Sequence, residues 1–453
     1  MSDDRPVTFK DVFAVSEYRA VWFALVASWI GDYLARAAVV VLVFRQTESI
    51  SLSAAAFAVS YLPWLLFGTV LSALAERHAY RGVMVFCDLA RMAVVALLVV
   101  PGVPWPMVLA VMFLVTLGGV PIQAARSALM PLMLDRGRLA VAMAANATSV
   151  QAAQVAGYLT GATLAAAANP QLAIAIVAVL FGTSALLVRA YVLPRPPAVP
   201  AEQRTHLLRE TAAGFRLVFG SRVLRSIALM VFAMAAFAIV PEGLAAGWAA
   251  HSGHDSVTRG IDQGLIMAAG PVGFVIGGLA VGRLVSQETR HRLIRPFAVL
   301  APLALVPALA APPVPVVVLL TMLSGVAQGG LMPTLNTHFV LTLPHGYRAR
   351  AFGVMQQGLQ VFQGGAVLVT GVLAERWSVP LVVGVWSVAG VLSMLLLAGR
   401  WPRVRTPEPV PGEAVLLPAA EPSARAENPP PGAVTEPTPG RHRFREAAGR
   451  MDG

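Results

Sequence analysis

The sequence predicts an all-α membrane protein with twelve transmembrane helices, arranged as two six-helix bundles related by a pseudo-twofold axis. Three observations support this fold class. First, 57% of the 453 residues are hydrophobic and only 13% are charged, whereas roughly a quarter of the residues of a soluble domain are charged. Second, apolar stretches long enough to cross a bilayer, which takes ~20 residues, recur along the chain. Third, basic residues gather in alternate connections between these stretches.

Charged or Pro/Gly-rich breaks separate the apolar stretches and set the expected order of the helices. In the first half, the predicted spans cover residues 20–44, 52–75, 82–100, 106–133, 140–168 and 171–193. In the second half they cover residues 223–250, 261–283, 293–311, 315–341, 351–374 and 378–400. The first stretch is too long for the core of a signal peptide, so it is predicted to be an uncleaved first helix.

The distribution of basic residues predicts the orientation of the helices. One set of alternate connections, with the segments flanking the first and last spans, carries 23 Lys and Arg residues, whereas the other set carries only Arg45, Arg259 and Arg376. Short cytoplasmic loops carry the excess of Lys and Arg. This ratio predicts an even number of spans and a cell (inner or plasma) membrane protein with both termini in the cytoplasm. Topology therefore explains the net charge of +11, and nucleic-acid binding is not expected.

Changes in composition divide the chain into four parts. We expect an N-terminal six-helix bundle over residues 1–193, a cytoplasmic linker over 194–222, a C-terminal six-helix bundle over 223–401 and a cytoplasmic tail over 402–453. The tail is rich in Pro, Ala and Glu and has few large apolar residues, so it is predicted to be disordered.

Short repeats relate the two halves. Residues 68–75 read GTVLSALA and residues 273–280 read GFVIGGLA, and both lie at the end of the second predicted helix of their half. The fourth predicted helices also share a Thr and a Gln at equal spacing: Thr116 and Gln123 against Thr321 and Gln328. Matches in the same order at corresponding helices are typical of parallel repeats related by an axis along the membrane normal.

Charged residues inside predicted spans are the first candidates for function. A charge at the bilayer centre costs ~2.5–3.5 kcal/mol on insertion scales. Asp32 and Arg36 lie four residues apart in the first helix, so their side chains can meet on one face. They are predicted either to couple transport to protons and anchor substrate, or to form a permanent structural ion pair. Glu242, which follows Pro241 in the seventh helix, is a second coupling candidate, and the alternative is a carboxylate facing the outer vestibule.

The connection between the second and third predicted helices contains a run of small residues, an acidic residue and then basic residues. It reads Ser72-Ala73-Leu74-Ala75-Glu76-Arg77-His78-Ala79-Tyr80-Arg81-Gly82. This loop resembles the signature loop of the major facilitator superfamily, with Glu76 where Asp is usual and Ser72 where Gly is usual. The resemblance covers roughly residues 15–400 and implies a transporter that works by alternating access.

Three further features resemble one branch of this superfamily, the branch with enterobactin-type and macrolide exporters. They are residues 30–36 (IGDYLAR), the pair Asp88 and Arg91, and residues 125–131 (ARSALMP). The Gly-Pro motif found in the fifth helix of many antiporters is missing, because residues 156–161 read AGYLTG.

The resemblance also implies a cytoplasmic gate in which opposite charges hold the two halves in one state. Its expected members are Glu76, Arg77, Arg81, Asp88 and Arg91. The alternative is a solvated loop that only obeys the positive-inside rule.

Uncharged polar residues in the fourth, fifth, tenth and eleventh helices are candidates for lining a partly polar cavity. They are Gln123, Asn146, Gln151, Gln154, Gln328, Asn336, Gln356, Gln357, Gln360 and Gln363. Hydrogen bonding between helices explains any single one equally well.

These features favour a secondary transporter, and we expect proton-coupled export of a small hydrophobic or amphipathic compound such as a drug, siderophore or secondary metabolite. An uptake permease for a nutrient is the alternative, and a non-transporting receptor or membrane enzyme is a third. The expected partners are a small-molecule substrate, a proton or sodium ion and the lipid bilayer, with the protein a monomer. The sequence has no phosphate-binding loop of the G-x-x-x-x-G-K type and no metal-ligand cluster, so no cofactor, metal or catalytic residue is expected.

Overall fold

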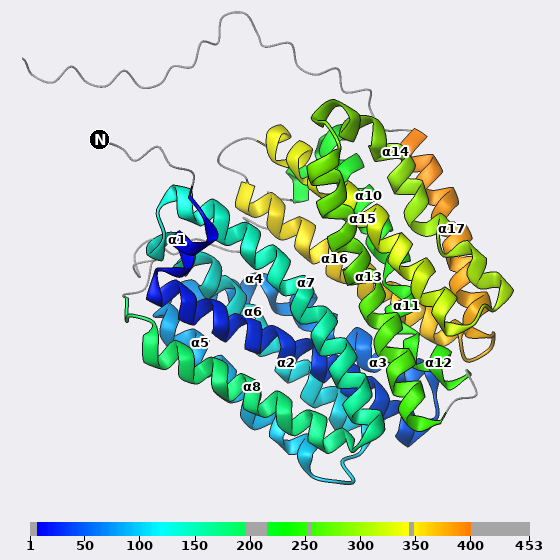
Figure 1. Ribbon diagram of the computed structural model, residues 1–453, viewed down its shortest axis with the longest axis horizontal. Coiled ribbons are helices and arrows are strands. Elements are labelled where there is room, and N and C mark those ends of the chain that lie inside the picture. Colours follow the sequence, from blue (N-terminus) through cyan, green and yellow to red (C-terminus); the bar gives the residue numbers. More distant parts are fainter. Residues whose placement is uncertain (1–6, 196–214, 252–254, 344–347, 400–453) are drawn as a thin grey trace, which may run out of the picture. The chain divides into compact units, whose positions relative to one another are not determined.

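The computed structural model describes residues 7–195, 215–251, 255–343 and 348–399. Most of the expected linker and the whole expected tail lie outside these ranges. Within them, every regular element is a helix. Figure 1 shows these helices coloured along the chain.

The first half of the chain forms six spans, preceded by the short helix α1 (Phe9–Phe13). The spans are α2 (Ser16–Thr47), α3 with η1 and α4 (Ile50–Ala58, Val59–Tyr61 and Leu62–Glu76), α5 with η2 (Tyr80–Ala96 and Leu97–Val99), α6 (Trp105–Met133), α7 (Arg136–Ala167) and α8 (Pro170–Tyr191). All six predicted spans overlap these helices closely.

The second half repeats this order. Its spans are α10 with α11 and α12 (Arg222–Ala238, Val240–Gly243 and Ala245–Ala250), α13 (Ser256–Leu284), α14 with η4 (Gln287–Leu303 and Val306–Ala310), α15 (Val314–Thr342), α16 (Arg348–Leu373) and α17 (Val379–Gly399). Among the described residues, ten spans are long and apolar enough to cross a membrane by length and composition. The other two, α7 and α16, have the length of a span and a more polar composition, which completes the predicted twelve.

The seventh span, predicted as one helix over residues 223–250 that Pro241 could bend, is broken into three helices. Helix α10 ends at Ala238, and α11 begins at Val240, directly before Pro241. Proline lacks a backbone N–H and its ring clashes with the preceding turn, so it interrupts a helix. This break holds Glu242 between two helix ends.

Contacts between connections agree with the predicted alternation of the spans. At the end of the molecule that carries Arg45, which we call the Arg-poor end, Arg45 Nη2 donates to the carbonyl of Ala166 at 2.7 Å. There Gln46 Nε2 donates to the carbonyl of Val103 at 2.9 Å. The first, third and fifth connections therefore meet at one end, and the opposite, Arg-rich end holds the others.

Glycines bring α13 and α15 into backbone contact. A Cβ added at Gly277 would lie 2.0 Å from the carbonyl oxygen of Val326, and one at Gly329 would lie 1.9 Å from that of Phe274. Small residues of this kind are typical of close helix contacts in membranes. The close contact leaves these two spans little freedom to separate.

The two halves touch mainly near the Arg-poor end. A Cβ at Gly260 of α13 would lie 2.2 Å from Cβ of Ala166 in α7, and one at Gly371 of α16 would lie 2.6 Å from Cβ of Ala54 in α3. These contacts lie in the last turns of α7 and α16 and the first turns of α3 and α13. Between the halves, on the Arg-rich side of the contacts, is the central cavity described next.

Candidate functional site

The central cavity lies between the two halves and has a volume of about 330 Å³. Its walls come from spans one to five of the first half and spans seven and eleven of the second. They are formed by Leu25, Ser28, Trp29, Asp32, Tyr33, Arg36, Tyr61, Trp64, Arg91, Thr116, Gly119, Ile122, Gln123, Val150, Gln154, Tyr158, Ile239, Gln356, Gln360 and Gln363. A second cavity of about 190 Å³ shares Gln154, Ile239 and Gln363 with it and extends to Glu242. The two cavities therefore adjoin.

A buried charge network surrounds Arg91. Its Nη1 donates to Asp88 Oδ1 at 3.1 Å and to Ser28 Oγ at 2.9 Å, and its Nη2 donates to Asp32. Asp88 also accepts from Ser184 Oγ at 2.6 Å. Two carboxylates therefore share one guanidinium, and hydroxyl groups supply further hydrogen bonds.

The surroundings hold Arg91 in one position. Its Nε donates to the carbonyl of Val115 at 2.9 Å, and its Cζ lies 3.9 Å from the centre of the Phe181 ring. A Cβ added at Gly118 would lie 2.7 Å from Arg91 Cγ, so only glycine leaves room for this side chain. Arg91 is only 2% exposed, which fits an arginine whose partners are all fixed.

The position of this network differs from the expected gate. Asp88 and Arg91 lie within α5, buried beside α2, and Arg91 pairs with Asp32 and Asp88 rather than with the loop that follows α4. Arg81 stays near the Arg-rich end, where its Nη2 donates to the carbonyl of Arg189. Arg77 follows the end of α4. Glu76 is the last residue of α4, and its side chain lies outside the described part of the structure.

The neighbours of Arg36 also differ from the one that the sequence predicted. No ion pair joins it to Asp32 in the described part of the chain, because Asp32 pairs with Arg91. The Arg36 guanidinium instead lies over two aromatic rings, 5.5 Å from the centre of Tyr33 and 5.6 Å from that of Tyr61. Tyr158 contacts Tyr33 edge-on at 5.3 Å. We call Tyr33, Tyr61 and Tyr158 the tyrosine cage.

Glu242 lies in the adjoining cavity, on the other half of the chain. It is only 7% exposed, and its Oε2 has no hydrogen-bond partner among the described residues. A carboxyl group in this position can exchange a proton with the cavity.

The amide side chains divide into two groups. Gln123, Gln154, Gln356, Gln360 and Gln363 line the central cavity, and Gln151 and Gln328 line the adjoining one with Gln154 and Gln363. Among the remaining candidates, Asn146 is buried with its Nδ2 3.7 Å from Met130 Sδ. Asn336 and Gln357 are not among the residues that line either cavity.

Sequence reasoning missed the tyrosines of the site and Trp64. The tyrosine cage and Trp64 line the cavity, but aromatic residues in an apolar helix look like ordinary core. The sequence did offer one signal. Tyr33 directly follows Asp32, and Tyr158 lies one helical turn after Gln154, so both tyrosines are close to a polar candidate residue.

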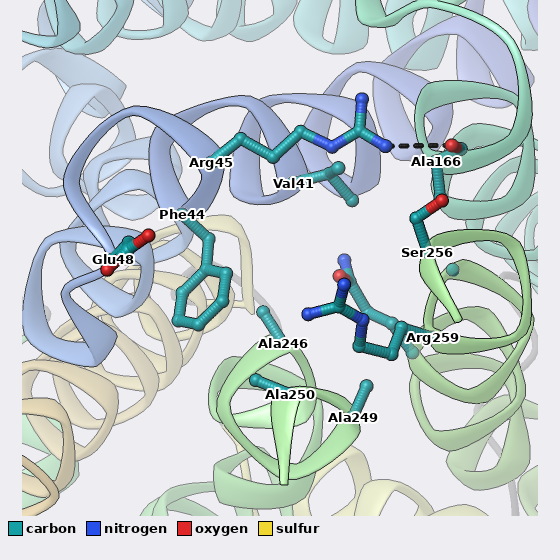
Figure 2. Close-up of a pocket in the computed structure, with 12 residues that line it drawn as sticks. Val41, Phe44, Arg45, Glu48, Ala166, Ala246, Ala249, Ala250, Ser256 and Arg259 are labelled. Atoms are coloured by element: carbon teal, nitrogen blue, oxygen red, sulfur yellow. Dashed lines mark hydrogen bonds between the residues drawn. The ribbon is translucent and has the colours of Figure 1, made fainter. Parts of the chain in front are cut away.

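A separate pocket of about 230 Å³ lies at the Arg-poor end. Figure 2 shows that Arg259 points into this pocket from α13, and that Arg45 is directed at the carbonyl of Ala166. Phe44 and Glu48 form the opposite wall.

A contact between the two halves closes the Arg-poor end beside this pocket. The Oε1 atom of Glu375, which follows α16, accepts from Ser49 Oγ at 2.5 Å and from the backbone N of Ser51 at 2.9 Å. Ser49 is the N-cap of α3. These hydrogen bonds favour the charged carboxylate and lower the pKa of Glu375. We call this contact the Glu375 latch.

Twelve spans in two repeated halves around a charged and aromatic cavity define a secondary transporter fold. Two overlapping matches, over residues 21–311 and 259–430, identify the family as the Major Facilitator Superfamily. The chain belongs to this family.

Solved structures with the same fold support this assignment. A POT family transporter in complex with a thioalcohol-conjugated peptide is 10% identical with a TM-score of 0.69, over 85% of this chain and 96% of that chain. A mutant of the peptide transporter POT in complex with alafosfalin is 15% identical with a TM-score of 0.66, over 88% and 96%. A mutant of the nucleoside transporter NupG is 13% identical with a TM-score of 0.66, over 84% and 100%. No curated protein matches the sequence.

Proposed function

We propose that this protein is a proton-coupled secondary transporter that moves a small amphipathic molecule across the cell membrane by alternating access. The observation that carries the proposal is the position of Glu242. An unpaired charge in a dry interior is costly, so a buried carboxyl group needs a proton or a cationic partner. Glu242 lies at a cavity between the two halves, where rocking of one half against the other exposes it to each side in turn.

The proposed orientation places the Arg-rich end in the cytoplasm, as the positive-inside rule expects. The Glu375 latch and the glycine contacts join the halves at the opposite end, so the described conformation is closed toward the outside. Asp32 is the second coupling candidate, because it faces the cavity while bound to Arg91.

Export is the first candidate direction. Residues 30–36 and 125–131 resemble exporters, and the cavity has aromatic walls suited to a drug, siderophore or secondary metabolite. In proton-driven export, the proton and the substrate compete, so lowering the pH is expected to weaken substrate binding.

Uptake is the second candidate direction. The similar solved structures include peptide transporters and a nucleoside transporter, and proton-driven uptake requires that proton and substrate bind together. Lowering the pH is then expected to strengthen substrate binding. The sign of the pH effect on binding therefore separates the two directions.

The first experiment measures gradient-driven movement of dyes, macrolides, siderophores, dipeptides and nucleosides in vesicles of both orientations. Wild-type protein is compared with Glu242→Gln and Asp32→Asn, and Arg259→Gln is the control outside the central cavity. We expect a proton gradient to drive movement in the wild type and the control, and Glu242→Gln to lose the drive. A drive that survives in Glu242→Gln contradicts its coupling role, and a drive by sodium alone contradicts proton coupling.

A further inference from the structure

We infer that the transported molecule is an organic anion, and that Arg36 binds its carboxylate or related acidic group while aromatic residues hold its apolar body. This inference rests on the proposed function and deepens it by naming the substrate class. The cavity that the proposal concerns is the central one, lined by Arg36, the tyrosine cage, Trp29 and Trp64.

The guanidinium of Arg36 is free to bind a ligand. It contacts the rings of Tyr33 and Tyr61 through its face. No carboxylate forms an ion pair with it in the ranges that the structure describes, although arginine presents five donors in a fork that matches a carboxylate. Because it borders the cavity, these donors are available to a substrate.

Arg91 shows what a structural arginine looks like in the same bundle. It has two carboxylates, a hydroxyl and a carbonyl as partners. Arg36 lies two helical turns from Trp29 in α2 and lacks such a set. A half-buried guanidinium retained only for structure would be expected to have more of its donors paired.

The two carboxylates in the network around Arg91 are already paired. Asp32 and Asp88 both pair with Arg91, so these three groups carry one net negative charge. Arg36 and Arg126 add two positive charges within the same membrane-spanning segments. The wall of the first half therefore carries a positive excess that suits an anion.

Arg126 is a second cation beside this wall, although it is not itself one of the residues that line the central cavity. Its Cζ lies 4.8 Å from the ring centre of Trp29, a residue that lines the central cavity. Its Nη1 is buried and has no hydrogen-bond partner in the part of the molecule that is described. Along α2, Trp29 precedes Arg36 on the side of the Arg-rich end, so Arg126 lies nearer that end than Arg36 does.

The rest of the cavity fits an amphipathic body. Trp64, Tyr61 and Tyr158 provide flat surfaces, and the glutamines provide donors and acceptors on the wall from the second half. A volume of about 330 Å³ lies at the lower end of the range for small-molecule pockets, and the adjoining cavity adds about 190 Å³. A cationic substrate would meet Arg36 and Arg126 without a free carboxylate on the same wall.

The inference also bears on direction. Arg36 lines the central cavity and Glu242 the adjoining one, and the two cavities share part of their walls, so an anion at Arg36 adds a negative charge close to Glu242. Binding of the anion and protonation of Glu242 then favour each other, which supports the uptake candidate.

The test uses three probes that share a dansyl fluorophore and differ in charge: dansylglycine (anion), dansylglycinamide (neutral) and dansylcadaverine (cation). Equilibrium binding to the full-length protein in nanodiscs is measured by energy transfer from tryptophan, Trp29 and Trp64 being at the cavity. The variants are Arg36→Gln and Arg36→Lys, and Arg259→Gln is the matched arginine control.

We expect the wild type and Arg259→Gln to bind dansylglycine about tenfold more tightly than dansylglycinamide, a difference of ~1.4 kcal/mol, since hydrogen bonds between charged partners are stronger than neutral ones. Arg36→Gln is expected to remove this preference. Arg36→Lys is expected to keep part of it, because lysine is a point charge without the planar fork.

Three results overturn the inference. The first is that the wild type shows no preference for dansylglycine, because it binds the probes equally or binds none of them. The second is that the wild type binds dansylcadaverine most tightly, and the third is that Arg36→Gln keeps the full preference for dansylglycine. The wild-type comparison needs no variant to fold. Anion-selective binding through Arg36 without gradient-driven movement in vesicles would refute the proposed transport and leave the binding inference standing.

Discussion

The Glu375 latch gives the sharpest prediction about the conformational cycle. Replacing Glu375 with Gln keeps a side chain of nearly the same shape and removes the charge from two hydrogen bonds that join the halves. We expect the equilibrium to shift toward the state open at the Arg-poor end.

The size of this shift follows from the exposure of the latch. Hydrogen bonds to a charged group contribute ~1.5–3 kcal/mol when shielded, but Glu375 is exposed, and solvent reduces such contacts to ~1 kcal/mol or less. A change of about 1 kcal/mol alters the ratio of the two states about fivefold.

The pH dependence of the latch has a definite sign. Because the pKa of Glu375 is lowered in the latched state, the carboxylate stabilises this state above the ordinary pKa of a glutamic acid. The contribution is lost as the pH falls through the lowered pKa. Acidification at the Arg-poor end is therefore expected to open that end, and Glu375→Gln is expected to abolish this response.

Spin-label distance measurements test both expectations. After Cys87→Ser, the only cysteine is removed, and labels are placed at Gln46 and Ser378, on the two sides of the Arg-poor end. A longer-distance population that grows in Glu375→Gln, and in the unsubstituted latch at low pH, is expected. Distance distributions that do not change with either the substitution or pH would refute the latch.

Three further predictions concern stability. Arg91→Met leaves two buried carboxylates without their cation, so we expect a loss of ~3–5 kcal/mol in the free energy of unfolding, seen as a lower midpoint in thermal unfolding; an unchanged midpoint would contradict the charge network. Gly118→Val is expected to displace Arg91, whose Cγ would lie 2.7 Å from the new Cβ, and to lower that midpoint by a comparable amount. Gly277→Val is expected to separate α13 from α15 and reduce folded yield in size-exclusion chromatography, whereas Gly282→Val, which has no atom within 4 Å of its Cβ, serves as its control and should behave like wild type.

The sequence predicted the order of the spans well because lipid imposes a simple requirement on them. A helix that crosses a bilayer needs a long apolar stretch, and the Arg-rich breaks mark its ends. The predicted sixth span, residues 171–193, lies almost wholly within α8 (Pro170–Tyr191). The break at Ile239 was harder to place, since apolar residues continue across it and only Pro241 marks the interruption.

The partners of charged residues were harder to predict from the sequence. Asp32 and Arg36 are spaced to meet on one helix, but the long side chain of Arg91 reaches Asp32 from α5. Which of two arginines pairs with a carboxylate depends on how three helices pack, and helical spacing within one of them does not determine this. The tyrosine cage was missed for a related reason: helical periodicity does not distinguish a ring that faces a cavity from one that faces lipid.

The broken seventh span has a mechanical consequence. Helices α10, α11 and α12 are joined at Ile239 and Leu244, so this span can change its angle at these joints while the rigid pair α13 and α15 moves as one body. Glu242 lies between the joints. A change in the charge of Glu242 would therefore act between these two joints, where it can alter the angle between the two ends of the span.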